Sequence, residues 1–141
     1  MKALGIDFGE KRIGLAMSDA EGRYAIPYKT LTRRSDQQAI EELSALAKEE
    51  SIELIVLGDP LNLDGSAGLQ SERVAAFSRK LAAALDLPIE TVNESLTSHE
   101  ANSRLREAGL TARQRRERVD SLAAQILLQE ALDRRRTADG V

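Results

Sequence analysis

The sequence has no cysteine, a single histidine and few aromatic residues, and its 141 residues contain no long hydrophobic segment. Without cysteine, disulfides, thiolate metal sites and thiol nucleophiles are all excluded. The longest segment free of charged residues, Ser121–Gln129, has nine residues, whereas a membrane helix needs about 20. Asp7 and Glu10 interrupt the opening segment, which is therefore unlike a secretory signal. We expect a cytoplasmic protein with no membrane segment, and carboxylates rather than histidine as catalytic groups.

Hydrophobic residues make up 42% of the chain and charged residues 30%, a balance typical of a domain with a packed core. No internal repeat or Pro/Gly-rich linker divides the sequence. We therefore expect a single domain over residues 1–141, with a C-terminal tail from about residue 137. The sequence leaves open whether the protein is a monomer or a homodimer.

The net charge of −3 conceals an uneven distribution. Residues 104–136 carry nine Arg against five acids, or +4, so the remaining residues carry −7. A block of this kind is typical of phosphate contacts, although a solvated helix face gives the same pattern. Because only 3% of residues are aromatic, base stacking is a poor expectation, and any nucleic acid would be held mainly by its backbone.

Hydrophobic periodicity predicts an α/β fold. Three strands joined by short connections form an antiparallel meander: Ala3–Phe8, Ile13–Met17 and a segment near Tyr24–Leu31. Two buried parallel strands and three longer helices follow in alternation: a helix over about 36–50, Ile52–Leu57, Gln70–Leu85, Pro88–Val92 and Val119–Arg136. A capping box at Thr97 and Glu100 opens a further short helix that Gly109 ends. The order predicts a five-stranded mixed sheet with helices on both faces.

Three acids stand out from this pattern. Asp7 occupies a strand that otherwise carries apolar or small residues, where it either binds a metal or pairs with Lys11 or Arg12. Glu94 follows the last strand, at the carboxyl edge where ligand sites gather, unless it is a plain loop residue. Asp120 begins the apolar stripe of the final helix, where the helix dipole alone would also favour an acid.

Three converging carboxylates without a lysine partner would repel one another, and two divalent cations would relieve that repulsion. Three charges of −1 against two of +2 leave +1, which suits a phosphodiester. Pairs of metal ions clamp the attacking and leaving oxygens of phosphoryl transfer, and oxygen-only ligands favour Mg²⁺ or Mn²⁺. We therefore predict a two-metal site.

Four segments in order resemble the motifs of the YqgF (RuvX-like) family, whose members are described as nucleases of pre-16S rRNA or as Holliday junction resolvases. These segments are Leu4–Ala16 with Ser18 and Asp19, Pro60–Ser66, Glu94 with Leu96–Ser98, and Val119–Ala124 with Ile126–Gln129. The match extends from Leu4 to Leu132. The resemblance implies an RNase H-like fold, and it implies that Asp7, Glu94 and Asp120 are the metal-binding acids.

The sequence departs from the family at several positions. The third motif usually reads Asp-Glu-Arg and here contains Asn93 and Ser95, so an accessory acid and a basic partner are missing. Asp59 stands where the family tends to be apolar, either as a fourth acid or as a turn residue before Pro60. Gly9 and Gly14 are expected to allow close approach of the two opening strands or of substrate.

The leading hypothesis is a metal-dependent nuclease, a hydrolase of phosphodiester bonds, that processes the 5′ end of a structured pre-16S rRNA during ribosome biogenesis. Its catalytic and metal-binding residues are Asp7, Glu94 and Asp120, and its expected substrate-binding residues are Lys11, Arg12, Asn62, Asp64, Arg113, Arg115 and Arg116. The alternatives are a Holliday junction resolvase acting on branched DNA and a catalytically silent nucleic-acid-binding module. An ATPase of the actin and sugar-kinase type is disfavoured because Glu10 replaces the phosphate-contacting Ser or Thr.

Overall fold

The computed structural model describes residues 1–59, 68–93, 109 and 111–138. Its elements follow one another along the chain as β1 (Ala3–Phe8), β2 (Arg12–Ser18), β3 (Ala25–Thr32), α1 (Asp36–Glu49), β4 (Leu54–Asp59), α2 (Leu69–Ala84), β5 (Ile89–Asn93) and α4 (Ala112–Ala138). The short helix expected from Thr97 lies outside the described residues. Gly109, which was expected to end it, has φ +79°, a conformation that favours glycine.

The strands form one mixed sheet in the order β3-β2-β1-β4-β5. Strands β1, β2 and β3 pair antiparallel as consecutive hairpins, and β4 and β5 add to β1 in parallel. The predicted meander with two parallel strands is therefore confirmed, with strand ends that differ by one or two residues from the expected ones. The carboxyl ends of β1, β4 and β5 lie at the same edge of the sheet.

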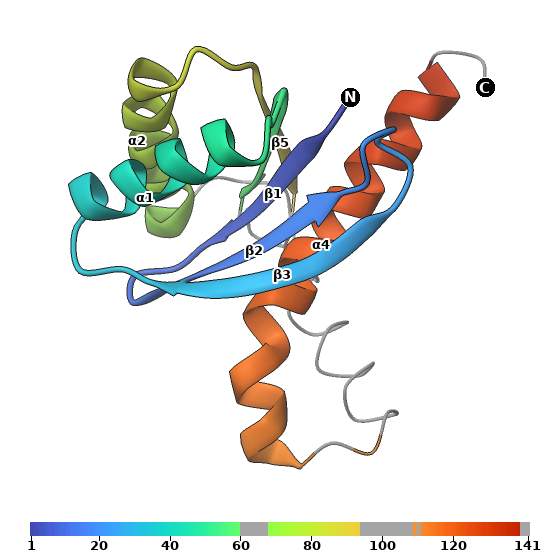
Figure 1. The fold of residues 1–141 in the computed structure, drawn as a ribbon. Helices are drawn as coiled ribbons and strands as arrows, with labels where there is room; N and C mark the ends of the chain where they lie inside the picture. Colours follow the sequence, from blue (N-terminus) through green and yellow to red (C-terminus); the bar gives the residue numbers. More distant parts are fainter. Residues whose placement is uncertain (60–67, 94–108, 110, 139–141) are drawn as a thin grey trace.

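Helices cover both faces of the sheet, as Figure 1 shows. On one face, α1 and α2 bury the larger side chains of the strands, among them Leu4, Ile6 and Phe8 of β1. On the other face, α4 packs over small residues such as Ala3 and Ala16 through its own Ala124 and Leu128. Successive residues of β1 therefore face opposite helix layers: the large side chains face α1 and α2, and the small residues face α4.

Helix α4 approaches the sheet so closely that two strand positions admit no side chain. A Cβ added at Gly5 would lie 2.8 Å from Cβ of Leu128 and 3.0 Å from the Ala124 carbonyl oxygen. A Cβ at Gly14 would overlap the carbonyl group of Asp120 and lie 2.9 Å from its Cβ. Gly14 therefore makes room for a helix rather than for a neighbouring strand. Gly9 does serve the turn between the opening strands, because its Cβ would lie 2.5 Å from the Arg12 carbonyl oxygen.

Helix α4 begins at Ala112, seven residues before the expected start at Val119. The added segment has no apolar periodicity, which is why the pattern did not reveal it. Its Ala, Gln, Arg and Glu residues are nevertheless among the better helix formers. In Figure 1 these first turns, drawn in orange, project beyond the edge of the sheet.

No helix within the described part of the chain is both long and apolar enough to cross a membrane.

We predict that Gly14→Ala lowers the free energy of unfolding by about 1–3 kcal/mol, the usual cost of overpacking a tight contact. The atoms in the way belong to the backbone and Cβ of Asp120, so only a shift of the helix can relieve the clash. Chemical denaturation of the variant and its parent measures the effect. Gly5→Ala provides the comparison. The atom nearest to an added Cβ is 0.8 Å farther away at Gly5 than at Gly14, so this variant is expected to lose less stability. Equal stability of Gly14→Ala and the parent would show that α4 does not rest on this residue.

Candidate active site

Asp7 lies near the end of β1, on the face of the sheet that α4 covers. Ala3 and Gly5 precede it by four and two residues, and both pack against α4. Side chains at alternate strand positions lie on the same face, so Asp7 shares that face. Its side chain is partly buried, and its register partner on β2 is Gly14.

Asp120 reaches the same place from the helix. Its carbonyl group and Cβ lie directly over Gly14, the residue paired with Asp7. The absence of a side chain at Gly14 therefore allows two acids separated by 113 positions in the sequence to gather at one edge of the sheet. Asp120 is also partly buried, with 21% of its side chain exposed. The structure thus brings together two of the three acids expected to form the site.

The third acid, Glu94, lies outside the described residues. It directly follows Asn93, the last residue of β5, which is in register with Asp59 at the end of β4. Among the residues that the structure describes, no three His, Asp or Glu side chains gather closely enough to hold a metal ion. The described pair therefore accounts for part of the predicted set, and Glu94 stays a prediction.

Asp59 does not join this pair. Asp59 follows Leu57 by two residues in β4, so the two side chains lie on the same face of the sheet. Leu57 belongs to the face that α1 and α2 cover. Oδ1 of Asp59 accepts a hydrogen bond of 2.6 Å from the Ser71 hydroxyl at the start of α2. The structure therefore does not support Asp59 as a fourth acid of the site: it is the last residue of β4, and its carboxylate is bonded to α2 through Ser71.

Arg12 forms an ion pair with Asp120. We expected Arg12 to bind phosphate, and the alternative was that it pairs with Asp7. Instead the Arg12 Nε donates a hydrogen bond of 2.8 Å to Oδ2 of Asp120. More than half of the Arg12 side chain is exposed, 58%, so the guanidinium is accessible from solvent while it holds the carboxylate. The sequence offered no signal for this pair, because its members are 108 positions apart.

The other expected substrate-binding residues are only partly described. Lys11 is exposed in the turn between β1 and β2. Asn62 and Asp64 lie outside the described residues, as does His99. The positions of Arg113, Arg115 and Arg116 belong to the first turns of α4, but their side chains are outside the described part.

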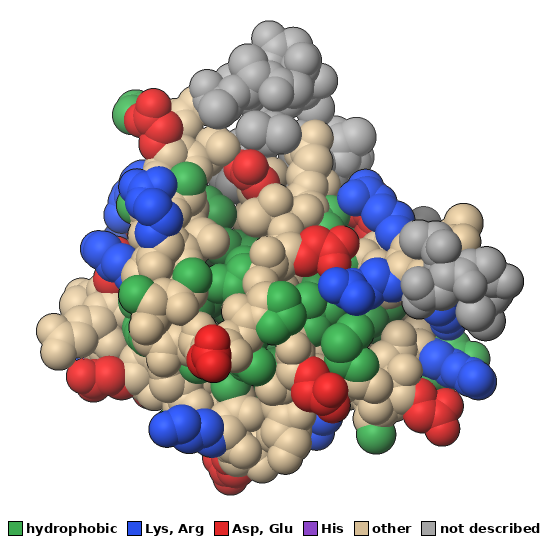
Figure 2. All heavy atoms as spheres, turned by 90° about the horizontal axis from the view of Figure 1, so that it is seen from above, with side chains coloured by type: hydrophobic (Ala, Val, Ile, Leu, Met, Phe, Trp, Pro, Cys, Tyr) green, Lys and Arg blue, Asp and Glu red, His purple; other side chains and the backbone are tan. Residues whose placement is uncertain are grey.

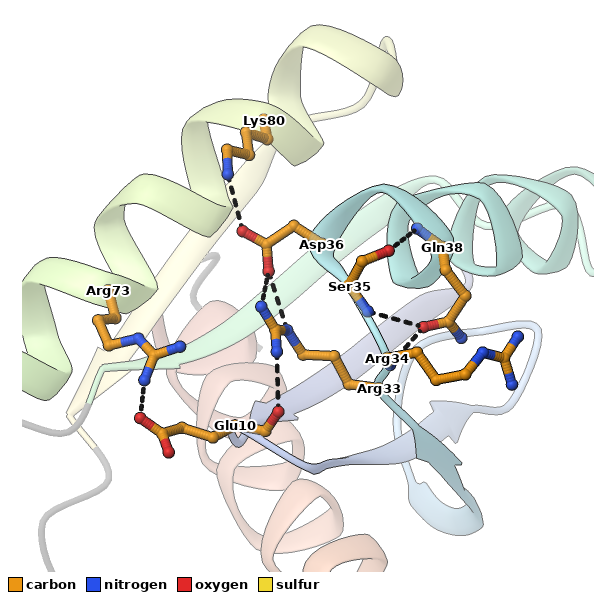
Figure 3. Close-up of polar contacts among 8 residues, drawn as sticks. All are labelled: Glu10, Arg33, Arg34, Ser35, Asp36, Gln38, Arg73 and Lys80. Carbon is orange, nitrogen blue, oxygen red and sulfur yellow. Dashed lines mark hydrogen bonds and ion pairs between the residues drawn. The ribbon is translucent and has the colours of Figure 1, made fainter.

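A network of charged residues holds the turn between β1 and β2, as Figure 3 shows. The Arg33 backbone N–H donates to the Lys11 carbonyl oxygen, and its Nη1 donates to the Glu10 carbonyl oxygen, both at 2.9 Å. The Glu10 carboxylate forms an ion pair with Arg73 of α2. The turn that presents Lys11 and Arg12 is thereby tied to both helices of the opposite face.

Asp36, at the first position of α1, is the centre of this network. Its Oδ1 accepts hydrogen bonds of 2.9 and 2.6 Å from Nε and Nη2 of Arg33, and its Oδ2 accepts one of 2.8 Å from Lys80. Burial acts to raise the pKa of the Asp36 carboxyl, but the hydrogen bonds from Lys80 and Arg33 outweigh it and hold the pKa below its ordinary value of 3.8. The ion pairs therefore favour the charged form in the folded protein.

The fold has relatives among solved structures at low sequence identity. RuvC from T. thermophilus, in complex with a Holliday junction substrate, superposes with a TM-score of 0.62 at 13% identity, covering 97% of this chain and 96% of the other. Fowlpox virus resolvase, in complex with Holliday junction DNA, gives a TM-score of 0.54 at 11% identity, covering 94% and 99%. These likenesses show an RNase H-like fold.

Sequence comparison is more specific. A protein of Crocosphaera subtropica named "Putative pre-16S rRNA nuclease" is 43% identical over 138 residues, covering 98% of this chain and 96% of the other. One of the same name from Syntrophus aciditrophicus is 43% identical over 133 residues, covering 94% and 89%. Fold and comparisons together define an RNase H-like nuclease, a hydrolase acting on ester bonds. The chain belongs to the RuvX family, whose profile, described as Holliday junction resolvase, matches residues 1–134.

We predict that Asp36→Asn destabilises the protein by about 1.5–3 kcal/mol at neutral pH, because it weakens charge-assisted hydrogen bonds to Arg33 and Lys80. A carboxyl whose pKa is lowered on folding contributes stability above its ordinary pKa and loses it as the pH falls below that value. The difference between parent and variant should therefore be constant above about pH 5 and shrink below pH 3.8. Denaturation midpoints measured across this range test the prediction. Asp86→Asn, at an exposed position, is the control, and a difference that persists at low pH would contradict it.

Proposed function

We propose that the protein hydrolyses phosphodiester bonds of nucleic acid with the help of divalent cations, and that Asp7, Glu94 and Asp120 form the site. The observation that carries the proposal is that Asp120 lies directly over Gly14, the register partner of Asp7 near the carboxyl end of β1. Glu94 follows β5, whose carboxyl end lies at the same edge.

The described residues fit divalent cations with oxygen ligands. Asp7 and Asp120 provide carboxylate oxygens only, which Mg²⁺ and Mn²⁺ prefer, and both side chains retain partial access to solvent. When bound, two such cations supply Lewis-acid stabilisation of the charge that develops on the phosphate oxygens. Asp7, on the rigid central strand, and Asp120, on the helix packed against it, would hold these cations at a fixed position on the sheet.

The substrate that we favour is precursor 16S rRNA, because the close relatives are named for it and are similar over nearly their whole length. Cleavage of four-way DNA junctions is the second candidate, supported by the description of the family and by the structural likeness to RuvC. Symmetric junction cutting requires two active sites related by a two-fold axis. A cytoplasmic location and a single domain belong to the same proposal.

Basic residues around the edge are the proposed phosphate contacts. Lys11 lies in the turn between β1 and β2, and Arg12 is the first residue of β2. Helix positions 113 and 116 precede Asp120 by about two turns and one turn. Positions spaced in this way share one side of a helix, and this part of α4 projects beyond the sheet (Figure 1). Position 115 falls on the opposite side, so it is the least favoured of the expected phosphate contacts. Asn62 and Asp64 stay predictions for the rim of the site.

We predict that Asp7→Asn reduces the rate of Mg²⁺- or Mn²⁺-dependent cleavage more than about 100-fold. Loss of a residue that only supports a metal ligand already lowers metal affinity or activity about 10- to 100-fold, and Asp7 is proposed to be a ligand itself. Cleavage of a pre-16S rRNA fragment and of a four-way junction, measured side by side, tests the proposal and ranks the two substrates. Asp59→Asn is the matched control: it removes an acid from the same edge but from the opposite face, and should cut at the parent's rate.

Undiminished cleavage by Asp7→Asn would show that the chemistry takes place elsewhere. Light scattering of the active protein separates the two substrates further. A monomer that cuts the RNA and leaves the junction intact supports rRNA processing, whereas a dimer that makes paired symmetric cuts supports junction resolution.

We predict that Arg12→Gln tightens binding of Mn²⁺ about threefold to fivefold in the absence of nucleic acid. Arg12 and a cation compete for the Asp120 carboxylate, and a partly exposed ion pair contributes about 1 kcal/mol or less. Titration calorimetry with Mn²⁺ measures the change without reference to activity. Lys11→Gln removes a neighbouring positive charge from the same turn and is expected to have a smaller effect. Equal effects of the two variants would mean that only the local charge matters, not the contact.

A further inference from the structure

Arg33 lies between the end of β3 and the start of α1, and only 17% of its side chain is exposed. Its Nε and Nη2 donate to Oδ1 of Asp36, and its Nη1 donates to the Glu10 carbonyl oxygen. Because each nitrogen of the guanidinium already donates to an oxygen of the protein, we do not assign Arg33 to direct contact with phosphate. It instead links the start of α1 to the turn between β1 and β2.

Arg33 restrains two consecutive carbonyl groups of this turn. Arg12 of β2 is in register with Thr32 of β3. One residue further on, the Arg33 backbone N–H donates at 2.9 Å to the Lys11 carbonyl oxygen, so the pairing of the two strands continues into the turn. The Glu10 carbonyl oxygen accepts from the side chain of the same arginine, also at 2.9 Å. One residue therefore holds the turn through both its backbone and its side chain.

The backbone around Arg33 is itself held by the capping box of α1, which Figure 3 shows. Oγ of Ser35 accepts from the Gln38 N–H at 3.0 Å. The Gln38 side chain accepts from the Arg34 N–H at 2.7 Å and donates to the Thr32 carbonyl oxygen at 3.0 Å. Hydrogen bonds therefore restrain the chain immediately before and after Arg33, and the turn is held from a fixed point.

Lys11, which this turn presents, lies beside the candidate active site. It directly precedes Arg12, whose Nε donates to Asp120. The Lys11 side chain is exposed, and within the described part of the chain it has no ion pair. The adjacent acid, Glu10, forms its ion pair with Arg73 of α2 instead. On the face that Figure 2 shows, by comparison, basic side chains are interspersed with acidic ones. Lys11 is therefore available to a phosphate group at the acid site.

We propose that Arg33 is a positioning residue for the nucleic-acid substrate: it fixes the turn that presents Lys11 to a phosphate group next to the cleaved bond. The inference rests on the proposed nuclease function and adds a residue that strengthens substrate binding without contact with the substrate. Ordering a mobile segment on binding costs free energy, and a segment that is already ordered avoids that cost. Arg33 therefore increases affinity through the order that it imposes on the turn.

Two variants separate the position of the turn from the charge of the network. Arg33→Lys keeps the positive charge, but one ammonium group does not reproduce the separate bonds of the guanidinium to Asp36 and to the Glu10 carbonyl. Lys80→Gln removes a positive charge that contacts Asp36 and leaves the contacts between Arg33 and the turn in place. We expect Arg33→Lys to weaken binding about threefold to fivefold and Lys80→Gln to bind like the parent.

Fluorescence anisotropy with a labelled pre-16S rRNA fragment in EDTA measures this affinity without cleavage. Denaturation curves give the folded fraction to which each affinity is referred. Loss of one phosphate contact also lowers the slope of log affinity against log salt concentration by about 1. The slope should fall toward that limit in Arg33→Lys and in Lys11→Gln, and should keep the parent's value in Lys80→Gln.

The double variant tests whether Arg33 acts through Lys11. If it does, Arg33→Lys should weaken binding much less in the Lys11→Gln background than in the parent. A purely structural role would give the same loss in both backgrounds. Amide hydrogen exchange provides a second measurement: exchange in the turn should be faster in Arg33→Lys than in the parent or in Lys80→Gln.

Equal losses in both backgrounds, equal affinities of Arg33→Lys and Lys80→Gln, or unchanged exchange in the turn would each overturn the inference. Unchanged affinity of Lys11→Gln would overturn it too, because the turn would then present no phosphate contact. None of these results depends on cleavage. The nuclease proposal is tested by Asp7→Asn in the presence of Mg²⁺ or Mn²⁺, so the two can fail independently.

Discussion

The contact between helix α4 and Gly14 of β2 is the constraint on which the rest of the structure depends. A helix can approach a sheet this closely only where the strand has no Cβ, and here the approaching residue is Asp120. The same glycine is the register partner of Asp7. The missing side chain at Gly14, together with that at Gly5, lets the helix approach the sheet, and Gly14 also allows the two acids to lie at the same edge. Packing and the geometry of the site are not independent in this protein.

Much of the fold could be predicted from the sequence because its signals are local. Alternation of Leu4, Ile6 and Phe8 with smaller residues identified β1 and its two faces, and the uninterrupted apolar run before Asp59 identified a buried parallel strand. Asp7 was recognised because it interrupts an apolar strand, and Asp120 because it begins the apolar stripe of the final helix. The early start of α4 had no such signal, since the segment before Val119 has helix-forming residues but no hydrophobic stripe.

The features that could not be predicted depend on contacts between distant positions. No periodicity relates Arg12 to Asp120, or Asp36 to Lys80, although both pairs are within hydrogen-bonding distance in the structure. The network at Arg33 adds a further point, because it ties the turn next to Asp7 to helices on the opposite face of the sheet.

The atoms that seat α4 on Gly14 are the carbonyl group and the Cβ of Asp120, and almost any residue at position 120 would have them. Helix docking and negative charge are thus supplied by different parts of one residue. A descendant of this protein could exchange the carboxylate for an amide, a hydroxyl or a methyl group and still assemble the same scaffold. Loss of chemistry by such a step would leave no trace in the architecture, and a relative that had become purely a scaffold would be distinguished from an enzyme only by inspection of that side chain.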